Sequence, residues 1–505
     1  MKTLQMIQMG IEVVFVPSTL LLIFFGTVIG VIFGALPGVS STMAVVLALT
    51  FTYGMDPVTS IAFLVAVYCA AITGGGITAI LFKIPGTPSN APTTFDGHPL
   101  AAKGYPLKAL SISLVTSAIG GIAAAILMLL ITPQLSAAAL KFGSSELFAI
   151  SAMGLSVLTA LDEGNTIKTL ISGLMGLLLA TVGMDPIHGF PRFTWGNSTL
   201  LSGIEMIPVM IGMFAVTKVL SETVSRSKIE SVEGVAGGDR VRDGIVTPKE
   251  LWEMKGTITR SGIIGTIVGI LPGAGATIAS FLSYSAEVKF AKNPSKYGHG
   301  EPRGIAAPET ANNAATAGSM VPLLSLGIPG GNAAAIMMSA LIMKGVQMGP
   351  MLLQRQPQYM GSVFVSMMFT NIVMVFVSFA VARVFGKILS IPYSILGTLI
   401  LLLATIGSFA LQNNTGNVIL MVIAGILGYA YDKFGFNIPA LILGLVLGPI
   451  VETNLRRAIM LEQGNVLAVF TKPITAVLLI VSIVSLVLPI IKPLIDNKKK
   501  VNATN

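Results

Sequence analysis

Charged residues are scarce in this sequence. Only 10% of its 505 residues are Asp, Glu, Lys or Arg, whereas 53% are hydrophobic; a soluble globular domain carries about 25% charge. The stretches 13–55, 310–343 and 388–431 contain no charged residue and no histidine. Each is longer than the roughly 20 residues with which a helix crosses the hydrocarbon core of a membrane. A soluble enzyme, a nucleic-acid-binding protein and a fibrous protein are therefore excluded.

Cysteine, histidine and nucleotide-binding motifs are nearly absent as well. The single cysteine, Cys69, excludes an intrachain disulfide, and the three histidines show no metal-ligand spacing. The sequence contains no Walker A motif and no cluster of acid/base residues on one face. We predict that the protein is not an enzyme and has no cofactor. The 31 basic residues against 22 acidic ones are typical of a membrane protein with basic cytoplasmic loops.

Apolar segments of helical length make up most of the chain. They do not alternate apolar and polar residues, which excludes a β-barrel. We predict an all-α polytopic membrane protein with about 12 transmembrane helices. The expected spans are 16–36, 58–82, 107–132, 145–161, 166–184, 203–221, 257–272, 311–328, 360–385, 390–411, 416–435 and 473–491. Four shorter pieces, 39–54, 274–286, 333–343 and 438–451, are expected to be either full spans or re-entrant half-helices.

An internal repeat divides the chain into two halves. Gly30, Gly34, Pro37, Gly38 and Thr42 match Gly265, Gly269, Pro272, Gly273 and Thr277 at a constant offset of 235 residues. Three further pairs follow in the same order: Ile84-Pro85-Gly86 with Ile328-Pro329-Gly330, Lys103-Gly104 with Lys344-Gly345, and Ile207-Pro208 with Ile438-Pro439. Internal repeats are common in secondary transporters, which bind substrate between them.

The repeat gives the expected domain organisation. Residues 1–221 are predicted to be the first membrane repeat, 222–256 a cytoplasmic linker, 257–495 the second repeat, and 496–505 a basic cytoplasmic tail. The loop 289–303 is basic, whereas its counterpart at 53–57 has no basic residue. This difference favours an inverted relation between the two repeats over a parallel one.

Two glycine-proline breaks are the first candidate site motif. Pro37 and Gly38, and their counterparts Pro272 and Gly273, should end a helix, since proline lacks a donor and glycine tolerates unusual dihedrals. The residues Ser40, Ser41 and Thr42 resemble the cap of a new short helix, whose free amides suit a carboxylate. The alternative is that the glycine ridge only packs helices closely, as expected for Gly26 and Gly30.

Two proline-glycine loops are the second candidate motif. The first has hinges at Pro85 and Gly86 and the polar residues Thr87, Ser89 and Asn90; the second has Pro329 followed by Gly330, Gly331 and Asn332. In a soluble protein such a cluster would be an ordinary turn. Because the second loop lies in a charge-free run, we predict that the two hairpin tips meet inside the protein.

Four more residues are candidate ligands. Asn312 and Asn313 precede the second loop, and Lys83 precedes the first; a lysine here either serves the site or extends to the interface. Backbone carbonyls with Thr42, Thr277 and Asn313 are candidates for a Na⁺ site. We predict that neutral donors hold the substrate, because an arginine cluster would bind a multivalent anion too tightly. The donors are Ser40, Ser41, Thr42, Thr87, Ser89, Asn90, Thr277, Asn312, Asn313, Gly330, Gly331 and Asn332.

The motifs resemble a known family. Gly34-Ala-Leu-Pro37-Gly38, Ile84-Pro85-Gly86-Thr87-Pro88 leading to Phe95-Asp96-Gly97-His98-Pro99, Leu271-Pro272-Gly273-Ala274-Gly275, and the stretch 304–332 are similar to the large membrane subunit of tripartite tricarboxylate transporters, the TctA type. The resemblance covers nearly the whole chain. It implies a secondary transporter of the bacterial inner membrane that takes up citrate or other carboxylates, driven by a Na⁺ or H⁺ gradient. It also implies two partners, a small four-span membrane subunit and a periplasmic solute-binding protein.

Two other classes of function remain open on the residues alone. A membrane-embedded enzyme acting on a lipid-linked substrate would need a cluster of acid/base or metal residues, which the sequence does not offer. An anion channel would not need paired broken hairpins. Uptake of labelled carboxylates into proteoliposomes, with and without a soluble binding protein, separates these classes from a transporter.

Overall fold

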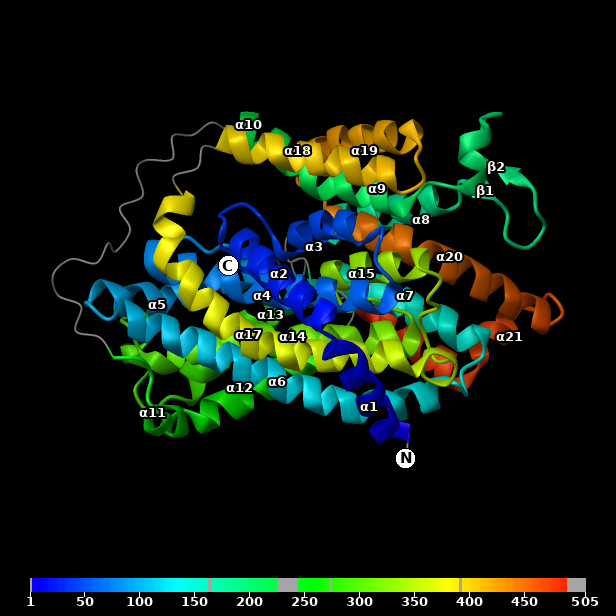
Figure 1. Ribbon diagram of the computed structural model, residues 1–505. Helices are drawn as coiled ribbons and strands as arrows, with labels where there is room; N and C mark the ends of the chain where they lie inside the picture. Colours follow the sequence, from blue (N-terminus) through cyan, green and yellow to red (C-terminus); the bar gives the residue numbers. More distant parts are fainter. Residues whose placement is uncertain (1, 162–165, 225–243, 272–274, 390–392, 488–505) are drawn as a thin grey trace, which may run out of the picture.

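The computed structural model describes residues 2–161, 166–224, 244–271, 275–389 and 393–487 (Figure 1). This part of the chain is almost entirely helical, which confirms the all-α class. Its β-structure is one small hairpin in which β1 (Gly183–Met184) pairs antiparallel with β2 (Pro191–Arg192).

The helices of the first half follow the predicted spans closely. They are α1 (Lys2–Val14), α2 (Pro17–Ala35), α3 (Ser41–Leu49), α4 (Pro57–Phe82), α5 (Thr93–Ala102), α6 (Pro106–Ala139), α7 (Ser144–Leu161), α8 (Thr166–Ala180), α9 (Met206–Ile211) and α10 (Thr217–Val224). Short 3-10 helices lie at Thr50–Thr52, Pro88–Asn90 and Ser198–Ser202. A π-helical turn, Gly212–Val216, joins α9 to α10.

The second half repeats this order of long and short helices. They are α11 (Pro248–Glu253), α12 (Lys255–Ile270), α13 (Gly275–Phe290), α14 (Pro302–Leu326), α15 (Asn332–Met343), α16 (Leu352–Arg355), α17 (Pro357–Leu389), α18 (Tyr393–Ala410), α19 (Thr415–Phe434), α20 (Ile438–Leu461) and α21 (Val466–Thr471). A 3-10 helix lies at Pro294–Lys296, and an apolar helix at Pro473–Val487 follows α21.

Seven helical segments of the described chain are long and apolar enough to cross a membrane. They are Pro17–Ala35, Pro57–Phe82, Pro106–Ala139, Met206–Val224, Pro357–Phe385, Thr415–Phe434 and Ile438–Leu461. The structure distinguishes the four shorter apolar pieces. Residues 438–451 belong to the full-length α20, whereas the other three pieces form the short helices α3, α13 and α15, of 9, 16 and 12 residues. The protein is a multi-pass membrane protein.

Glycine contacts hold two equivalent helix pairs together. α2 packs against α4, and α12 against α14. A Cβ at Gly34 would lie 2.0 Å from the carbonyl oxygen of Ala71, and one at Gly269 would lie 2.4 Å from that of Ala315. Such contacts require glycine, because only its backbone can approach a neighbouring helix so closely. The packing expected for the glycine ridge is therefore confirmed in both halves.

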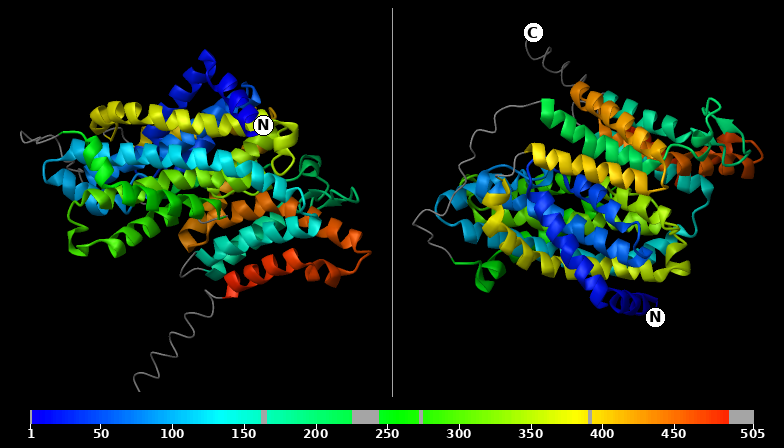
Figure 2. Two further views of the ribbon diagram at one scale, coloured as in Figure 1. Left: turned by 90° about the horizontal axis from the view of Figure 1, so that it is seen from below. Right: turned by 45° about the horizontal axis from the view of Figure 1, so that its top comes forward.

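The two halves exchange their flanking helices. α9 and α10 of the first half pack against α18 and α19 of the second, and these helices form the upper layer in Figure 1. In return, α20 of the second half packs against α7 and α8 of the first (Figure 2) and also contacts α9 and α19. The core is formed by α2, α4, α6, α12, α14 and α17. Neither half is a separate folding unit.

The predicted linker contains ordered structure. α10 extends to Val224, and residues 225–243 lie outside the described part. The remainder includes α11, whose first turn is stabilised by a capping box between Thr247 and Glu250. Glu250 also forms an ion pair with Lys108 of α6, so this end of the linker is tied to the first half. The predicted tail, 496–505, lies outside the described residues.

Candidate functional site

The chain breaks between α2 and α3 where the sequence predicts. Gly38 has a φ of +86°, in the left-handed region that favours glycine. Ser40 caps α3: its hydroxyl accepts a hydrogen bond from the backbone N–H of Met43 at 3.1 Å. Ser41 and Thr42 form the first turn, and Thr42 is buried. The predicted broken helix and capped half-helix are both present.

The second half has an equivalent break. α12 ends at Ile270, and α13 begins at Gly275, which has a φ of +63°. Pro272 and Gly273, the predicted hinges, lie outside the described residues. Thr277 lies in the first turn of α13 and is half-buried.

The first loop, residues 83–92 between α4 and α5, turns back into the protein. α4 ends at Lys83 in the left-handed conformation (φ +57°), and the backbone N–H of Gly86 then reaches the carbonyl of Gly75 at 3.2 Å. A Cβ at Gly86 would lie 2.1 Å from the carbonyl oxygen of Gly34. The loop therefore packs on the end of α2, next to the α2–α3 break. The side chain of Lys83 itself is exposed.

Polar side chains of the first loop bond to one another below the surface. Thr87, Ser89 and Asn90 are 2%, 4% and 0% exposed. The Thr87 hydroxyl donates to Asn90 Oδ1 at 2.5 Å and lies 2.9 Å from the Ser89 hydroxyl. This network fixes the orientation of the Asn90 amide, whose Nδ2 then points away from Thr87.

The second loop, residues 327–331 between α14 and α15, repeats the backbone of the first. α14 ends at Gly327 in the left-handed conformation (φ +74°), at the position equivalent to Lys83. A Cβ at Gly330 would lie 2.8 Å from the carbonyl oxygen of Gly269, as Gly86 does with Gly34. Pro329 precedes it, Gly331 is the N-cap residue of α15, and Asn332 begins that helix.

Both loops meet at α13. Residues 88–90 of the first loop pack against this helix, and a Cβ at Gly331 of the second loop would lie 3.9 Å from Gly275 Cα at its start. The two loops therefore approach the same helix inside the protein, although they come from opposite halves.

Equivalent helices of the two halves run antiparallel. The hydroxyls of Tyr68 on α4 and Ser319 on α14 lie 3.3 Å apart. Further along α4, the Thr73 hydroxyl donates to Asn313 Oδ1 at 3.0 Å. As the residue number rises along α4, it falls along α14. Because α4 and α14 are equivalent in the repeat, the two halves oppose each other across this contact.

Asn312 and Asn313 occupy different environments on α14. Asn313 accepts the hydrogen bond from Thr73. Asn312 is fully buried, and neither its Oδ1 nor its Nδ2 has a hydrogen-bond partner. A buried amide without partners is costly. Asn312 therefore offers a free donor and a free acceptor inside the protein.

A buried glutamate joins the two halves, and the sequence argument did not single it out. Glu309 of α14 is 0% exposed. Its Oε1 accepts hydrogen bonds from Asn90 Nδ2 at 3.0 Å and from the Thr93 hydroxyl at 2.6 Å, and its Oε2 accepts one from Ser117 at 2.9 Å. The signal was present, since an acid in an apolar segment marks a functional position.

A second buried acid, Asp96, lies in the first turn of α5. Its Oδ1 accepts hydrogen bonds from the backbone N–H groups of Gly300 and Glu301, both at 2.8 Å, and its Oδ2 accepts one from the Tyr284 hydroxyl. These amides lie at the start of α14, where a carboxylate is favoured by the helix dipole. Asp96 therefore fixes the start of α14 against the first half.

One cavity brings two of the predicted motifs together. Its volume is about 390 Å³, within the range of small-molecule sites. Its walls are the α2–α3 break, the first loop and the π-helical turn between α9 and α10, where π-turns often mark functional sites. The predicted residues that line it are Gly38, Ser40, Pro85, Gly86 and Thr87. Lys218, which the sequence argument missed, adds a cation to the wall and pairs with Glu222 at 2.8 Å.

The other predicted ligands do not line this cavity. Ser41 and Thr42 lie on α3, and Ser89 and Asn90 lie on the first loop. The residues of the second half, including Thr277, Asn312 and Asn313, lie on α13 and α14. The proposed Na⁺ ligands Thr42, Thr277 and Asn313 come from three helices, and the amide oxygen of Asn313 already accepts from Thr73. Within the described residues, no group of three His, Cys, Asp or Glu side chains could hold a metal.

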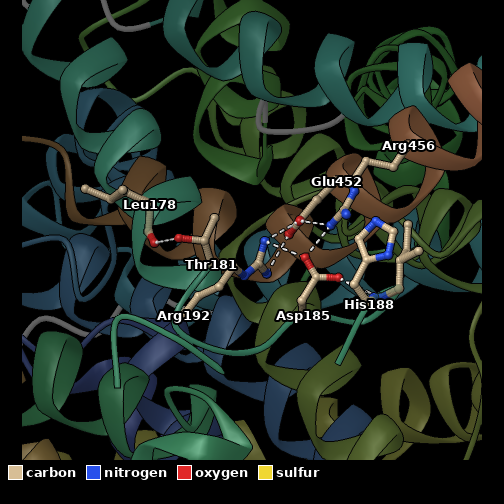
Figure 3. A network of polar contacts seen from close by, with 8 residues as sticks. Leu178, Thr181, Asp185, His188, Arg192, Glu452 and Arg456 are labelled. Carbon is tan, nitrogen blue, oxygen red and sulfur yellow. Dashed lines mark hydrogen bonds and ion pairs between the residues drawn. The ribbon is translucent and has the colours of Figure 1, made fainter. Parts of the chain in front are cut away.

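A second, larger cavity lies at the other end of α9. Its volume is about 750 Å³, and its lining includes residues 204–207, Ser339, Arg192 and Glu452. Figure 3 shows the charged network at its edge: Arg192 donates to both carboxylate oxygens of Glu452, at 2.5 and 3.1 Å. Arg456 donates to Asp185 at 2.6 Å and to Glu452 at 3.0 Å. This network ties the β1–β2 hairpin to α20.

Asp185 in this hairpin is held in its charged form. The backbone N–H of His188 donates to Asp185 Oδ1, and the guanidinium of Arg456 donates to Oδ2 (Figure 3). These contacts, with the backbone N–H of Ile187, keep the pKa of Asp185 well below its usual range.

Comparison with known proteins identifies relatives along the whole chain. The sequence profile of the tripartite tricarboxylate transporter TctA family matches residues 20–443. The chain is 35% identical over 501 residues to the "Uncharacterized 52.8 kDa protein in TAR-I ttuC' 3'region" of Agrobacterium vitis, covering 99% of each chain. It is also 39% identical over 235 residues to the "Uncharacterized protein in TAR-II ttuC' 3'region" of the same organism, covering 46% of this chain and 97% of that one.

No solved structure matches this chain. The match to the family profile nevertheless spans α2 to α20, and it includes both breaks, both loops and Glu309. The chain therefore belongs to the tripartite tricarboxylate transporter TctA family.

Proposed function

We propose that this chain is the large transmembrane subunit of a cation-coupled, binding-protein-dependent secondary transporter that imports carboxylates across a bacterial inner membrane. The observation that carries the proposal is the cavity of about 390 Å³ between the α2–α3 break and the first loop. Interrupted helices beside a cavity are the usual substrate site of repeat-built transporters. Family membership agrees with this use of the site.

The donors on the cavity wall suit a carboxylate. The hydroxyls of Ser40 and Thr87 and the positive charge of Lys218 line it, together with one acid, Asp432, whose carboxylate accepts a hydrogen bond from Ser221. A hydrogen bond to a charged acceptor contributes about 1.5–3 kcal/mol, which is enough to hold an anion and still let it go. The second half contributes the free amide of Asn312 and the loop residues Gly330, Gly331 and Asn332. In this proposal they bind the substrate in another conformation of the transporter.

The repeats are proposed to be inverted across the membrane. The antiparallel course of α4 and α14 supports an axis in the membrane plane, since equivalent helices would otherwise run in the same direction. One cavity contacts the start of α9 and the other the π-helical turn and the start of α10; in this proposal they belong to the two openings of alternating access.

Transport is proposed to be coupled to a cation. Moving one negative charge into an inside-negative compartment costs about 2.3 kcal/mol per 100 mV. An anion with several charges therefore accumulates only if positive charge enters with it.

Two partners complete the proposed transporter, a periplasmic solute-binding protein and a small four-span membrane subunit. The test is uptake of labelled tricarboxylates, dicarboxylates and aromatic acids into proteoliposomes, with and without these partners. We expect saturable uptake only when both are present. Saturable high-affinity uptake by this chain alone would contradict the partnership, conductance far above carrier turnover would indicate a channel, and chemical conversion of a lipid-linked compound would indicate an enzyme.

A further inference from the structure

Glu309 is an ionisable group in a place where charge is costly. It lies on α14, is completely buried, and contacts helices α4 and α6 of the core. Its neighbour Gly76 has no side chain, and a Cβ there would lie 3.0 Å from Glu309 Oε1. The carboxyl therefore occupies space that the fold leaves open for it. Burying an unpaired charge is strongly unfavourable, so this site needs a counter-charge or a proton.

The hydrogen-bond partners of this carboxyl are all neutral. They are the Asn90 amide and the hydroxyls of Thr93 and Ser117. A further hydroxyl, that of Ser113, lies beside the carboxyl without a hydrogen bond of good geometry. No cation is among these partners.

The charged groups on the surrounding helices make their contacts elsewhere. Asp96 on α5 binds backbone amides at the start of α14, Lys108 on α6 pairs with Glu250, and Glu287 on α13 pairs with Arg260. The remaining described titratable side chains on the packed elements and their caps are Asp56, Tyr68, Cys69, Lys83, His98, Lys103, Tyr105, Lys255, Tyr284, Lys289, Glu301, Arg303, Lys344, Arg355, Tyr359 and Arg383. None of these appears among the described ion pairs or hydrogen bonds of Glu309.

The site satisfies a protonated carboxyl group completely. In that form, Oε1 accepts from Asn90 and Thr93, and the proton on Oε2 is donated to the hydroxyl of Ser113 or Ser117. Ser117 can then donate to the Glu309 backbone carbonyl, 3.4 Å away. Loss of the proton leaves a carboxylate with neutral donors only and a net negative charge in the core.

The orientation of Asn90 favours a proton over Na⁺. The Thr87 hydroxyl donates to Asn90 Oδ1, so the amide presents its NH₂ group to Glu309. A cation between these side chains would meet this positive end of the amide, whereas hard cations take oxygen ligands.

We infer that Glu309 takes up and releases the coupling proton, and that Asn90 and Thr87 transmit its charge state to the substrate cavity. Thr87 lines the cavity and forms a hydrogen bond with Asn90, and Asn90 forms a hydrogen bond with Glu309. A carboxylate at position 309 attracts the Asn90 amide more strongly than the acid does, so protonation changes the hold on the first loop. The link to transport rests on the proposed function; the proton site itself does not.

The first test is infrared spectroscopy of the purified chain. We expect the carbonyl band of a protonated carboxylic acid in apolar surroundings, and we expect E309Q to lack it. Glutamine suits the site, because its oxygen can accept from Asn90 and Thr93 while its NH₂ donates to Ser113 or Ser117. Glu12→Gln, at an exposed position on α1, is the matched control and should keep the band. The same band in E309Q would overturn the inference.

The second test compares coupled and uncoupled transport in proteoliposomes that contain the partner proteins. E309Q should lose roughly tenfold or more of the accumulation driven by a pH gradient, within the range of known site-to-site couplings. It should keep exchange of labelled for unlabelled carboxylate. Wild-type accumulation by E309Q under a pH gradient would overturn the inference. So would a variant that loses only the accumulation driven by a Na⁺ gradient.

Two further measurements keep the outcomes distinct. If E309Q does not fold, Glu309→Asp, which keeps an exchangeable proton, should retain both the infrared band and pH-driven accumulation; loss of the band in that folded variant would overturn the inference. If the wild-type chain with its partners moves no carboxylate, the proposed function fails, and the infrared comparison alone decides whether position 309 holds a proton.

Discussion

The two loops that enter the core share a backbone but differ in side chains. Each follows a helix that ends in the left-handed conformation, at Lys83 and at Gly327, and each places a glycine against the end of a neighbouring helix. The first loop carries Thr87, Ser89 and Asn90, which are buried and hydrogen-bonded. The second, Gly327-Ile-Pro-Gly-Gly331, carries no polar side chain before Asn332, which is half-buried.

This difference separates the geometry of the site from its chemistry. The backbone turn is specified twice, because both halves need a loop that returns into the core. The polar network is built once, from the first loop and Glu309 of the opposite half. The first loop is therefore expected to respond to the charge of Glu309. The second is expected to act through its backbone shape, and the nearby helix α14 through the free amide of Asn312.

The largest expected effect concerns the orientation of the two halves relative to each other across the membrane. Tyr53 precedes α4 and Lys296 precedes α14, and these two helices run antiparallel. Cysteines introduced by Tyr53→Cys and Lys296→Cys should therefore react with an impermeant reagent from opposite sides of the membrane. The native Cys69 is buried and serves as the unreactive background. Labelling of both positions from one side would reject the inverted repeat.

Next in size is the effect of adding a side chain to each loop. Gly86→Ser places a Cβ 2.1 Å from the Gly34 carbonyl oxygen and should destabilise the fold by about 1–3 kcal/mol or more. Gly331→Ser meets only Gly275 Cα at 3.9 Å, keeps a good N-cap residue, and should change stability by at most about 0.5 kcal/mol. Thermal melts in detergent measure both, and equal losses would refute the contrast.

The variants Asn90→Ala and Asn332→Ala should differ in stability, but both substitutions should change uptake. Asn90→Ala removes one hydrogen bond from the Thr87 hydroxyl and one from the Glu309 carboxyl, at a cost of about 1–3 kcal/mol. Asn332→Ala should cost at most about 0.5 kcal/mol. If both variants remain folded by thermal melt and keep wild-type uptake and apparent affinity, these residues do not hold the substrate.

A smaller difference is expected between two equivalent lysines. Lys344 donates to the carbonyl oxygens of Thr52, Tyr53 and Met55, whereas Lys103 donates to that of His299 and is exposed. Lys344→Met should cost about 1.5–3 kcal/mol, and Lys103→Met less than about 1 kcal/mol. Urea-induced loss of helicity provides the measurement. A larger loss of stability in Lys103→Met than in Lys344→Met would show that the contact of Lys103 with His299 is the stronger of the two contacts between the halves.

The smallest effect concerns pH and lies outside both loops. Because the pKa of Asp185 is lowered in the folded state, its contribution to stability is fully present above the ordinary aspartate pKa of about 4. It is lost as the pH falls through the folded-state value. The melting temperature of Asp185→Asn should lie below that of the wild type at neutral pH and approach it in acid. A constant difference at all pH values would exclude this ionisation as the cause.

The breaks and loops could be predicted from the sequence because their causes are local. Gly38 acts through its positive φ, and Gly86 through a close contact with Gly34 that a glycine alone permits. Ser40 caps a helix three residues ahead of it in the chain. The structure places the first break and the first loop on one cavity, whereas Pro272 and Gly273 of the second break lie outside the described residues.

The partners of these motifs could not be predicted, because they come from distant parts of the chain. Glu309 lies 219 residues from Asn90, and Lys218 reaches the cavity because the π-helical turn before α10 packs against the distant helix α3. Spacing along one helix contains no information on such contacts. Lys83 illustrates the opposite case: its position beside the first loop was predicted, but the left-handed end of α4 leaves its side chain exposed.

The exchange of flanking helices has a consequence for biosynthesis. α7 and α8 are complete when residue 180 has been made, but their partner α20 ends at residue 461. At the usual 5–20 residues per second, the ribosome needs roughly 15–55 seconds to synthesise the intervening chain. During that time the faces of α7 and α8 that α20 will cover must be shielded by lipid or by the insertion machinery. Assembly of this membrane protein is thus completed late, after nearly the whole polypeptide has been inserted.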